Sequence, residues 1–524
     1  MRTGTRISAR RLPPLFLALL LVVLPGPASS ARQAQVTPAA ARVDIHVARP
    51  RLFVLTDIAN EPDDQMSLVR LLVYANQFDV EGLVATTSTW LRTGVRPDVL
   101  HRVLDAYGEV QPNLLRHAPG FPPVDDLKRV VAPGQPGYGM EATGPGKTSA
   151  GAALLLAALR RDDPRPLWVT AWGGANTLAQ ALVDARAQVA GDQLRAALSR
   201  LRVYAISDQD DAGAWVRREF PDLHYIAMPS TQDGQEYAAA TWTGISGDRF
   251  YRNAPGADFT TFGDAWVDAH IRARGPLGTV YPYPCCIHEG DTPSFLGLID
   301  NGLASAMSPS YGGWGGRYVW RRPHGEPRAF WTQGGDAYPG RDSSRDTVRG
   351  ADGQVYTSDQ ATIWRWRAAF QHDFAARMAW TVLAPDAANH NPQVVVNGVG
   401  GTAPVVVHAT VGQSVLLDAS GTRDPDGHAL TYHWWFYPEA GTGIPGQPVM
   451  TARPGGAPPP ELHASPPAAR GVREAPRVRV DDATTSRASV VPLVPGVAHV
   501  ILEVTDAGTP SLTSYRRVIV TTGQ

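Results

Sequence analysis

Residues 51–64 most constrain what this chain can fold into, because an apolar stretch runs directly into a group of acidic side chains. Residues 52–55 are all hydrophobic, which predicts a strand buried inside a sheet. The acids that follow are Asp57, Glu61, Asp63 and Asp64. Carboxylates that are forced together repel one another unless a proton or a cation joins them, and Ca²⁺, which prefers oxygen ligands, is the simplest occupant. The sequence therefore predicts chemistry at the carboxyl end of this strand.

Helix capping is an alternative role for two of these acids. The apolar positions within residues 65–76 recur at helical spacing,. Asp63 or Asp64 could therefore cap this helix instead of binding a ligand. Asp57 ends a buried strand and has no capping role, which favours the functional interpretation.

Apolar strands alternate with helical segments along residues 50–385, which is typical of an α/β fold with a mostly parallel sheet and helices on both faces. Further strands are expected at residues 80–88, 166–172, 201–207 and 223–229. Loops at the carboxyl ends of parallel strands share one rim of the sheet. The polar and aromatic residues of these loops should therefore meet near Asp57 and bind substrate: Asn60, Glu61, Asp63, Trp90, Asn176, Asp208, Gln209, Asp210 and Asp211.

A further polar cluster, His288-Glu289-Gly290-Asp291, precedes a short apolar segment at residues 294–299. Asp291 could cap the helix expected there and also bring a last carboxylate to the cation, since the two roles are compatible. Glu289 would then be a free carboxyl near the site, suitable as a ligand or a proton donor. His288 could protonate a leaving group, although a histidine at a loop–helix junction is usually structural.

The N-terminus predicts export. Arginines at positions 2, 6, 10 and 11 precede an apolar run at 15–24 and small residues at 28–31. This pattern is typical of a signal peptide over residues 1–31 and places the mature protein outside the cell or in the periplasm. The run is shorter than the about 20 residues that cross a bilayer, so no membrane span is expected. With 48 basic and 49 acidic residues, the chain has no net charge that would attract a nucleic acid polymer.

Cys285 and Cys286 are the only cysteines and stand side by side. Two cysteines cannot provide a disulfide framework for a chain of this length. They could form a vicinal disulfide in an oxidising compartment, but two buried thiols are the commoner outcome.

The composition changes after residue 385, where Asn389-His390-Asn391-Pro392 marks a linker. Short alternating strands separated by turn signals follow, which predicts an all-β Ig-like sandwich. We therefore expect one domain at residues 45–388 and a second, dispensable for the chemistry, at 391–524. Asp424 and Asp426 of the second domain could bind another Ca²⁺, but Asp424-Pro-Asp-Gly is more simply a polar turn.

These motifs resemble the nucleoside hydrolase superfamily, most closely its secreted bacterial nucleoside hydrolase-like branch, which carries an Ig-like C-terminal domain and is sometimes labelled cellulose-binding. The family's Asp-Thr-Asp-x-Gly-x-Asp-Asp signature corresponds to Thr56-Asp57 through Asp63-Asp64, with two extra residues between the acids. Residues 205–211, 241–247 and 289–296 match the closer branch. The family's Asn after the second strand has no counterpart here, which leaves the substrate open.

The resemblance implies that Ca²⁺ is held by Asp57, Asp64, a backbone carbonyl near Trp172, and Asp291 or Glu289. It also implies that Asp57 acts as general base on a metal-bound water, while Asp63 binds a ribose hydroxyl. The implied reaction is hydrolysis of the N-glycosidic bond of ribonucleosides or a related furanoside. The alternative is a secreted protein that binds carbohydrate, such as a polysaccharide, without cleaving it.

Overall fold

The computed structural model describes residues 38–229, 240–247, 255–323, 325–333, 344–442 and 477–522, together with residues 1 and 238 and the backbone of 469–470. The signal peptide expected at residues 1–31 lies outside these residues, apart from Met1. Residues 36–524 form one compact unit. No helix in the described part of the chain is both long and apolar enough to span a membrane.

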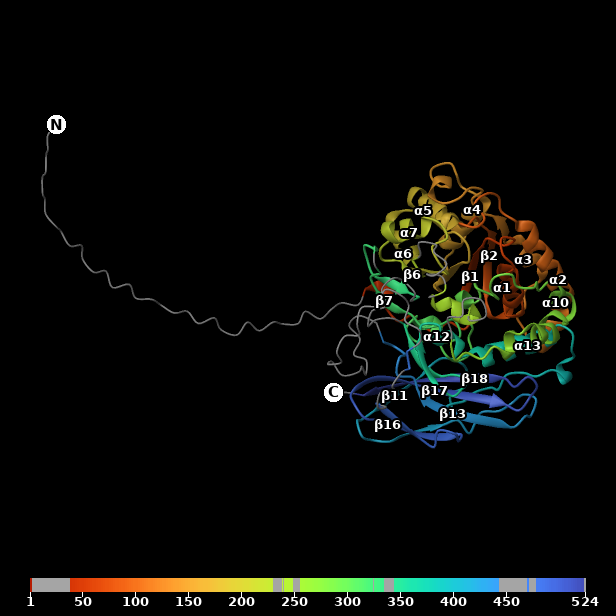
Figure 1. The fold of residues 1–524 in the computed structure, drawn as a ribbon, viewed down its shortest axis with the longest axis vertical. Helices are drawn as coiled ribbons and strands as arrows, with labels where there is room; N and C mark the ends of the chain where they lie inside the picture. Colours follow the sequence, from red (N-terminus) through yellow and green to blue (C-terminus); the bar gives the residue numbers. More distant parts are fainter. Residues whose placement is uncertain are drawn as a thin grey trace. The chain divides into compact units, whose positions relative to one another are not determined.

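An eight-stranded sheet forms the centre of residues 51–332, with the strand order β3-β2-β1-β4-β5-β6-β8-β7 (Figure 1). All neighbouring pairs are parallel except β7–β8 at one edge. The strands are β1 (Arg51–Thr56), β2 (Asp79–Ala85), β3 (Val131–Pro133), β4 (Leu167–Ala171), β5 (Leu201–Ala205), β6 (His224–Ala227), β7 (Val319–Arg321) and β8 (Phe330–Thr332). The predicted mostly parallel sheet is confirmed.

Helices cover both faces of this sheet, because successive side chains of a strand point to opposite sides. Leu52 and Val54 of β1 pack into one hydrophobic cluster with α1 (Pro62–Val73), α2 (Pro97–His117) and α13 (Arg367–Trp380). Phe53 and Leu55 pack into a second cluster with α4 (Ala150–Arg160), α5 (Asn176–Gln188) and α7 (Ala212–Glu219). Since β1 is buried on both faces, its carboxyl end opens only at the rim.

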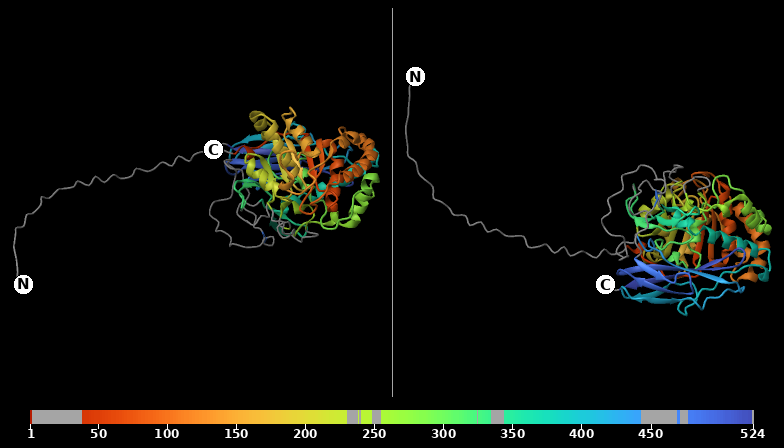
Figure 2. Two further views of the ribbon diagram at one scale, coloured as in Figure 1. Left: turned by 90° about the horizontal axis from the view of Figure 1, so that it is seen from above. Right: turned by 60° about the horizontal axis from the view of Figure 1, so that its bottom comes forward.

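The C-terminal region is all-β, as predicted. One sheet has the order β11-β18-β17-β13 and the other β12-β16-β15, and both are drawn in blue in Figure 2. The strands are β11 (Val405–Ala409), β12 (Val415–Asp418), β13 (Leu430–Phe436), β15 (Val478–Asp481), β16 (Arg487–Pro492), β17 (Gly496–Asp506) and β18 (Thr513–Thr522). Both sheets share one hydrophobic cluster that includes Trp434 and Val490. A short sheet of β9 (Asp346–Arg349), β10 (Val355–Ser358) and β14 (Ala469–Arg470) is separate from them.

Candidate functional site

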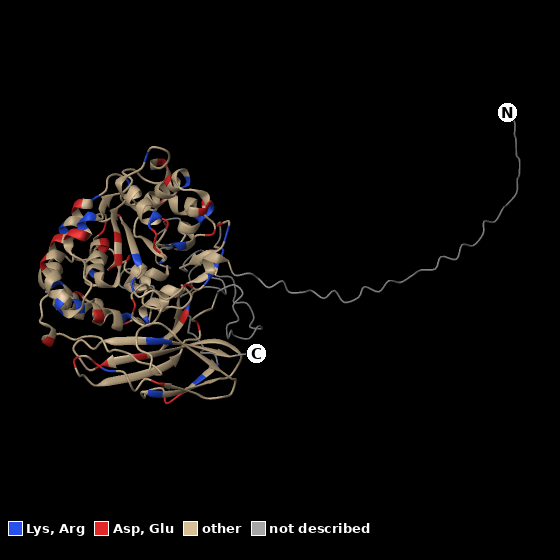
Figure 3. Cartoon of the chain, turned by 180° about the vertical axis from the view of Figure 1, so that it is seen from behind, with Lys and Arg blue, Asp and Glu red and all other residues tan. Residues whose placement is uncertain are grey.

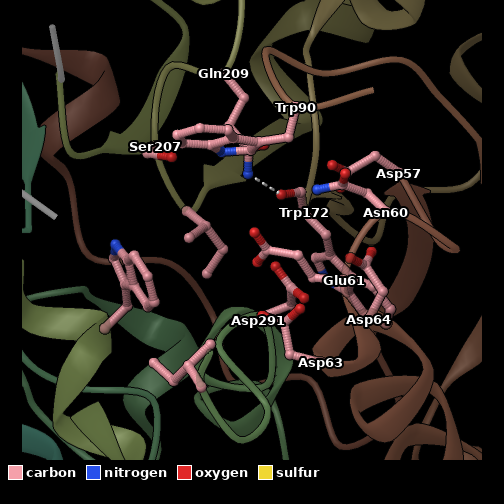
Figure 4. Close-up of a pocket in the computed structure, with 13 residues that line it drawn as sticks. Asp57, Asn60, Glu61, Asp63, Asp64, Trp90, Trp172, Ser207, Gln209 and Asp291 are labelled. Atoms are coloured by element: carbon pink, nitrogen blue, oxygen red, sulfur yellow. Dashed lines mark hydrogen bonds between the residues drawn. The ribbon is translucent and has the colours of Figure 1, made fainter. Parts of the chain in front are cut away.

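A cleft lies at the carboxyl end of the central strands, where the sequence places the acidic loop (Figure 4). The space between its atoms, including the part open to solvent, is about 510 Å³. Its lining consists of Asp57, Asn60, Glu61, Asp63, Asp64, Trp90, Trp172, Ile206, Ser207, Gln209, Trp242, Ile287 and Asp291. Nine of the predicted site residues are therefore in one place, and five of them are acidic.

Asp57 stands directly after β1, and only 3% of its surface is exposed. The backbone of the following turn closes from Asn60 N–H to the Asp57 carbonyl over 3.1 Å, and Ala59 has a positive φ of 83°. Gly173, after β4, packs against the Asp57 carboxylate so closely that a Cβ there would lie 2.7 Å from its Oδ1. Burial raises the pKa of Asp57 to about 6, although a hydrogen bond from Ser88 opposes the shift,.

Asp63, Asp64 and Asp291 form the tightest acidic group in the cleft. One carboxylate oxygen from each lies within 4.8 Å of the others, and all three residues are buried. Burial, followed by the neighbouring charges of Glu61 and Asp57, raises the pKa of Asp63 to about 8. Burial and the adjacent aspartates also raise the pKa of Asp64 and Asp291 well above the ordinary value. Three buried carboxylates at this distance are stable only if protons or a cation neutralise them.

The structure supports a hard cation as the partner of this group. Oδ2 of Asp291 is buried and has no hydrogen-bond partner among the described residues. A Cβ on Gly290 would lie 2.7 Å from Asp63 Oδ2, so the backbone is fitted closely around the carboxylates. All three donors are oxygen atoms, which Ca²⁺ and Mg²⁺ prefer. Asp63 was expected from the sequence to bind substrate, and Asp57 to bind the metal. In the structure, the group of three acids includes Asp63 and does not include Asp57.

Trp172 and Gln209 connect the strand ends around the cleft. Gln209 donates its side-chain N–H to the Trp172 carbonyl at 2.5 Å (Figure 4). The Trp172 indole N–H donates to Ser294 Oγ at 2.8 Å, and Ser294 Oγ donates to the Asp291 carbonyl at 2.6 Å. This chain of hydrogen bonds fixes the loop that carries Asp291 against the end of β4.

Glu289 does not have the free carboxyl that the sequence suggested. Its Oε2 lies 2.6 Å from Nε of Arg70, and its Oε1 accepts a hydrogen bond from the Tyr281 hydroxyl at 2.6 Å. Both Glu289 and Arg70 are fully buried, and Glu289 is not part of the cleft lining. The expectation of a free carboxyl is therefore wrong, because this ion pair joins α1 to the loop before Asp291. Glu289 therefore positions that loop and is unsuited to act on substrate.

His288 is also outside the cleft lining, although its neighbour Ile287 belongs to it. The imidazole is fully buried and packs edge-on against Phe262, with ring centroids 5.7 Å apart. Its backbone carbonyl accepts a hydrogen bond from Ser246 Oγ at 2.7 Å. The structure therefore places His288 in the wall behind the cleft, which corrects the expectation that it faces a leaving group.

Four rim residues expected to touch substrate have structural partners instead. The Asp208 carboxylate forms two hydrogen bonds with Arg217, at 2.8 and 2.7 Å. Asp210 accepts the backbone N–H groups of Asn176 and Ala212, each at 3.0 Å. The others are Asp211, which accepts Met140 N–H at 2.7 Å, and Asn176, whose amide donates to Thr87 Oγ1 and the Gly137 carbonyl. These residues hold the rim loops together, and none of them lines the cleft.

Four lining residues were not among the predicted site residues: Ile206, Ser207, Trp242 and Ile287. Trp242 lies in the short 3-10 helix Thr241–Ile245, which is too short for a hydrophobic period to mark it in the sequence. The available signal was its place in residues 241–247, a stretch that resembles the closer branch of the family.

Basic and acidic positions are interspersed along the described chain (Figure 3). Cys285 and Cys286, which directly precede the cleft residue Ile287, are joined by a disulfide. Both are exposed, so the expectation of two buried thiols was wrong.

The raised pKa values make stability depend on pH in the absence of metal. Because Asp63 has a folded pKa of about 8, above its ordinary 3.8, its stabilising contribution is present at low pH and is lost as the pH rises toward 8. We expect wild type to become progressively less stable than Asp63→Asn between about pH 4 and pH 8 in chelator, measured by urea unfolding. Added Ca²⁺ should reverse this order at pH 7.5. A constant difference in the free energy of unfolding across this pH range would contradict the pKa shift.

Two family models match the chain. The model described as cellulose-binding Sde182, nucleoside hydrolase-like domain, matches residues 51–318. The model described as cellulose-binding protein Sde0182, C-terminal domain, matches residues 414–522. A search of curated proteins gave no significant match.

Among solved structures, a nucleoside hydrolase-related hypothetical protein from Saccharophagus degradans, described as associated with carbohydrate metabolism, shares 34% sequence identity with this chain. The match covers 91% of this chain and 100% of that chain, with a TM-score of 0.70. A PKD domain is 19% identical over 23% of this chain and 82% of its own, with a TM-score of 0.14. The type III effector XopQ, complexed with adenosine diphosphate ribose, is 13% identical over 66% of this chain and 97% of its own, with a TM-score of 0.29. These last two scores are too low to indicate a shared fold.

The first family model covers about half of the chain, and the Saccharophagus degradans protein matches nearly all of it. Strands β1 to β6 of the central sheet and the acidic loop after β1 lie within the first family-model match, and strands β12 to β18 lie within the second. The chain belongs to the cellulose-binding Sde182 family, whose members carry a nucleoside hydrolase-like domain.

Proposed function

We propose that this chain is an exported hydrolase of glycosyl bonds that cleaves the N-glycosidic bond of ribonucleosides or the bond of a related furanoside. The observation that carries the proposal is the cleft in which Asp57 stands beside Asp63, Asp64 and Asp291. Simple recognition of a sugar does not require four buried acids at one point. Hydrolysis at an anomeric carbon does use such groups, because positive charge develops on the sugar in the transition state.

Asp57 is the general base in this proposal. Burial raises its pKa to about 6. A general base works best when its pKa lies near the working pH, because it is then largely ionised and still basic enough to take a proton. It would take the proton of the water that attacks the anomeric carbon. Glu61, whose pKa is raised by burial, lines the same cleft and would stabilise the developing positive charge.

Asp63, Asp64 and Asp291 would hold the metal ion, which we propose to be Ca²⁺. When bound, the ion would supply a Lewis acid that lowers the pKa of water and orients the hydroxyl groups of the sugar. The chain's own contribution is a rigid set of oxygen donors, since Thr56 Oγ1 donates a hydrogen bond to Asp64 and Gly290 packs against Asp63. These contacts fix the carboxylates before any ligand arrives.

The cleft also offers surfaces that suit a sugar or a base. Trp90 is 53% exposed at the mouth of the cleft, and Trp242 forms part of its lining. An exposed indole face packs well against the apolar face of a ring. Exposure of Trp90 is also what favours the second candidate function, binding of carbohydrate without cleavage, which agrees with the description of the family.

Release of reducing sugar from nucleosides, aryl ribosides, arabinofuranosides and cello-oligosaccharides tests the proposal. Each substrate is incubated with Ca²⁺ and with chelator, and direct binding to the same compounds is measured in parallel. Release that requires Ca²⁺ supports the hydrolase and identifies its leaving group. Binding to a sugar without release from any substrate would favour the binding protein.

Replacing Trp90 with alanine should raise KM for the best substrate about tenfold while kcat changes little, because the indole contributes binding area and no proton transfer. The steady-state rate at increasing substrate concentration measures both constants. Tyr283→Ala is the matched control, since Tyr283 is 64% exposed and lies outside the cleft lining. Equal KM values for Trp90→Ala and wild type would remove Trp90 from the site.

A further inference from the structure

A second group of metal-binding side chains lies in the all-β region, outside the cleft. It consists of Asp424 and His428, in the turn before β13, and Asp506 at the end of β17. One ligand atom from each lies within 4.8 Å of the others. This group and the cleft trio are the two such groups in the described part of the chain.

The carboxylate of Asp424 provides the observation that points to a ligand. Its side chain is 1% exposed, and Oδ1 accepts the backbone N–H groups of Asp426 and His428 at 3.0 and 2.9 Å. Oδ2 is buried and has no hydrogen-bond partner among the described residues. A buried carboxylate oxygen without a partner is costly, and a cation would satisfy it.

Asp506 and His428 complete the arrangement. Asp506 is 4% exposed, its Oδ1 accepts the backbone N–H groups of Gly508 and Leu512, and its Oδ2 accepts one hydrogen bond among the described residues, from the Asn389 amide at 3.1 Å. His428 Nδ1 lies 3.4 Å from Asp424 Oδ1, and no hydrogen bond to this nitrogen is present among the described residues. In the same part of the structure, neither aspartate pairs with lysine or arginine. The two carboxylates therefore lie close together, with the His428 imidazole beside them and no lysine or arginine partner among the described residues.

We propose that Asp424, Asp506 and His428 form a second divalent-cation site. Its imidazole nitrogen and carboxylate oxygens make a mixed donor set, which suits Mn²⁺ or Zn²⁺ better than the all-oxygen trio of the cleft does. The site has a structural role. Asn389, which donates to Asp506, also accepts the Trp380 indole N–H at 2.9 Å through its carbonyl, so the ion would brace the turn at 424–428 and β17 against the end of α13. Asp426, the other acid expected to bind Ca²⁺, pairs with His390 at 3.0 Å instead.

Metal content per full-length chain tests this proposal. Chelator-treated protein is dialysed against Mn²⁺, and bound metal is measured for wild type, Asp424→Asn, Asp64→Asn and the control Asp481→Asn. Asp424→Asn should lose one equivalent relative to wild type, and Asp481→Asn, which changes an exposed acid of the same region, should lose none. Metal content in Asp424→Asn equal to wild type would overturn the second site. The outcome for Asp64→Asn separates this result from the cleft, because it reports only the proposed catalytic ion.

Thermal unfolding shows whether Asp424→Asn is folded. If this variant does not unfold cooperatively, His428→Ala provides the same test, since His428 is 36% exposed and carries little packing. Mn²⁺ binding at the second site should then weaken at least tenfold. Unchanged Mn²⁺ affinity in folded His428→Ala would overturn the proposal.

Discussion

Asp57→Asn is expected to lower kcat about a thousandfold on any substrate that the wild-type protein hydrolyses. The amide has nearly the shape of the carboxylate but cannot accept the proton of the attacking water. Loss of a general base lowers the rate by about two to four powers of ten. The fold should remain intact, because the substitution removes a negative charge that repels the neighbouring carboxylate of Asp64. In chelator, the variant should unfold at a higher urea concentration than wild type.

The measurement is single-turnover hydrolysis in saturating Ca²⁺, with cooperative unfolding as the test of folding. Asp211→Asn is the matched control, because Asp211 stands on the same rim but its carboxylate accepts Met140 N–H and does not line the cleft. Substrate binding by Asp57→Asn should persist. A folded Asp57→Asn protein with wild-type turnover would exclude Asp57 as the base.

The sequence predicts those parts of the cleft whose position follows from the pattern of buried strands. Leu52 to Leu55 identify a strand that is buried on both faces, and parallel strands must present their carboxyl ends at one rim. That reasoning located Asp57, Trp172 and Gln209 together, although 152 residues separate the first from the last. The carboxylates of the first loop follow from the same geometry.

The errors arose where a partner distant in sequence decides the role of a side chain. Glu289 was assigned to the site as a free carboxyl next to the proposed ligand Asp291, but its ion pair with Arg70 depends on how α1 packs against that loop. Asp208 was included with its acidic neighbours, but Arg217, one helix further on, takes both of its oxygens. Local composition shows that acids are concentrated near a rim, while tertiary packing determines which of them face the cleft.

The role of the all-β region also depends on contacts between residues that are distant in sequence. The change in composition after residue 385 suggested a separate domain that the chemistry does not need. Arg517 of β18 is fully buried, and its guanidinium donates to the carbonyls of Leu303, Tyr311 and Gly312. These carbonyls belong to the loop that follows α11 (Pro293–Leu296), shortly after Asp291. The contacts argue that the all-β region supports the cleft.

Removal of residues 389–524 is therefore expected to abolish cooperative unfolding of residues 38–388, and activity with it. Trp366 would lose Trp435, Tyr437 and Tyr515, which surround its buried ring at centroid distances of 5.5 to 6.2 Å. Exposure of each such aromatic side chain costs about 2 kcal/mol, and several are exposed together. Asp346 would also lose the Tyr437 hydroxyl, which donates to it at 2.5 Å.

Circular dichroism during heating, together with hydrolysis at 25 °C, measures the effect of this truncation. Full-length Arg517→Met is the graded control: it keeps the all-β region but removes the hydrogen bonds to the Leu303, Tyr311 and Gly312 carbonyls, which should cost about 3 kcal/mol of unfolding free energy. Its kcat should stay near wild type at temperatures where it is folded, because Arg517 lies outside the cleft lining. A truncated chain that unfolds cooperatively and hydrolyses substrate at the wild-type rate would show that the all-β region is an independent module. The expected loss would show instead that the buried face of β18 is part of the fold that holds Asp291 in place.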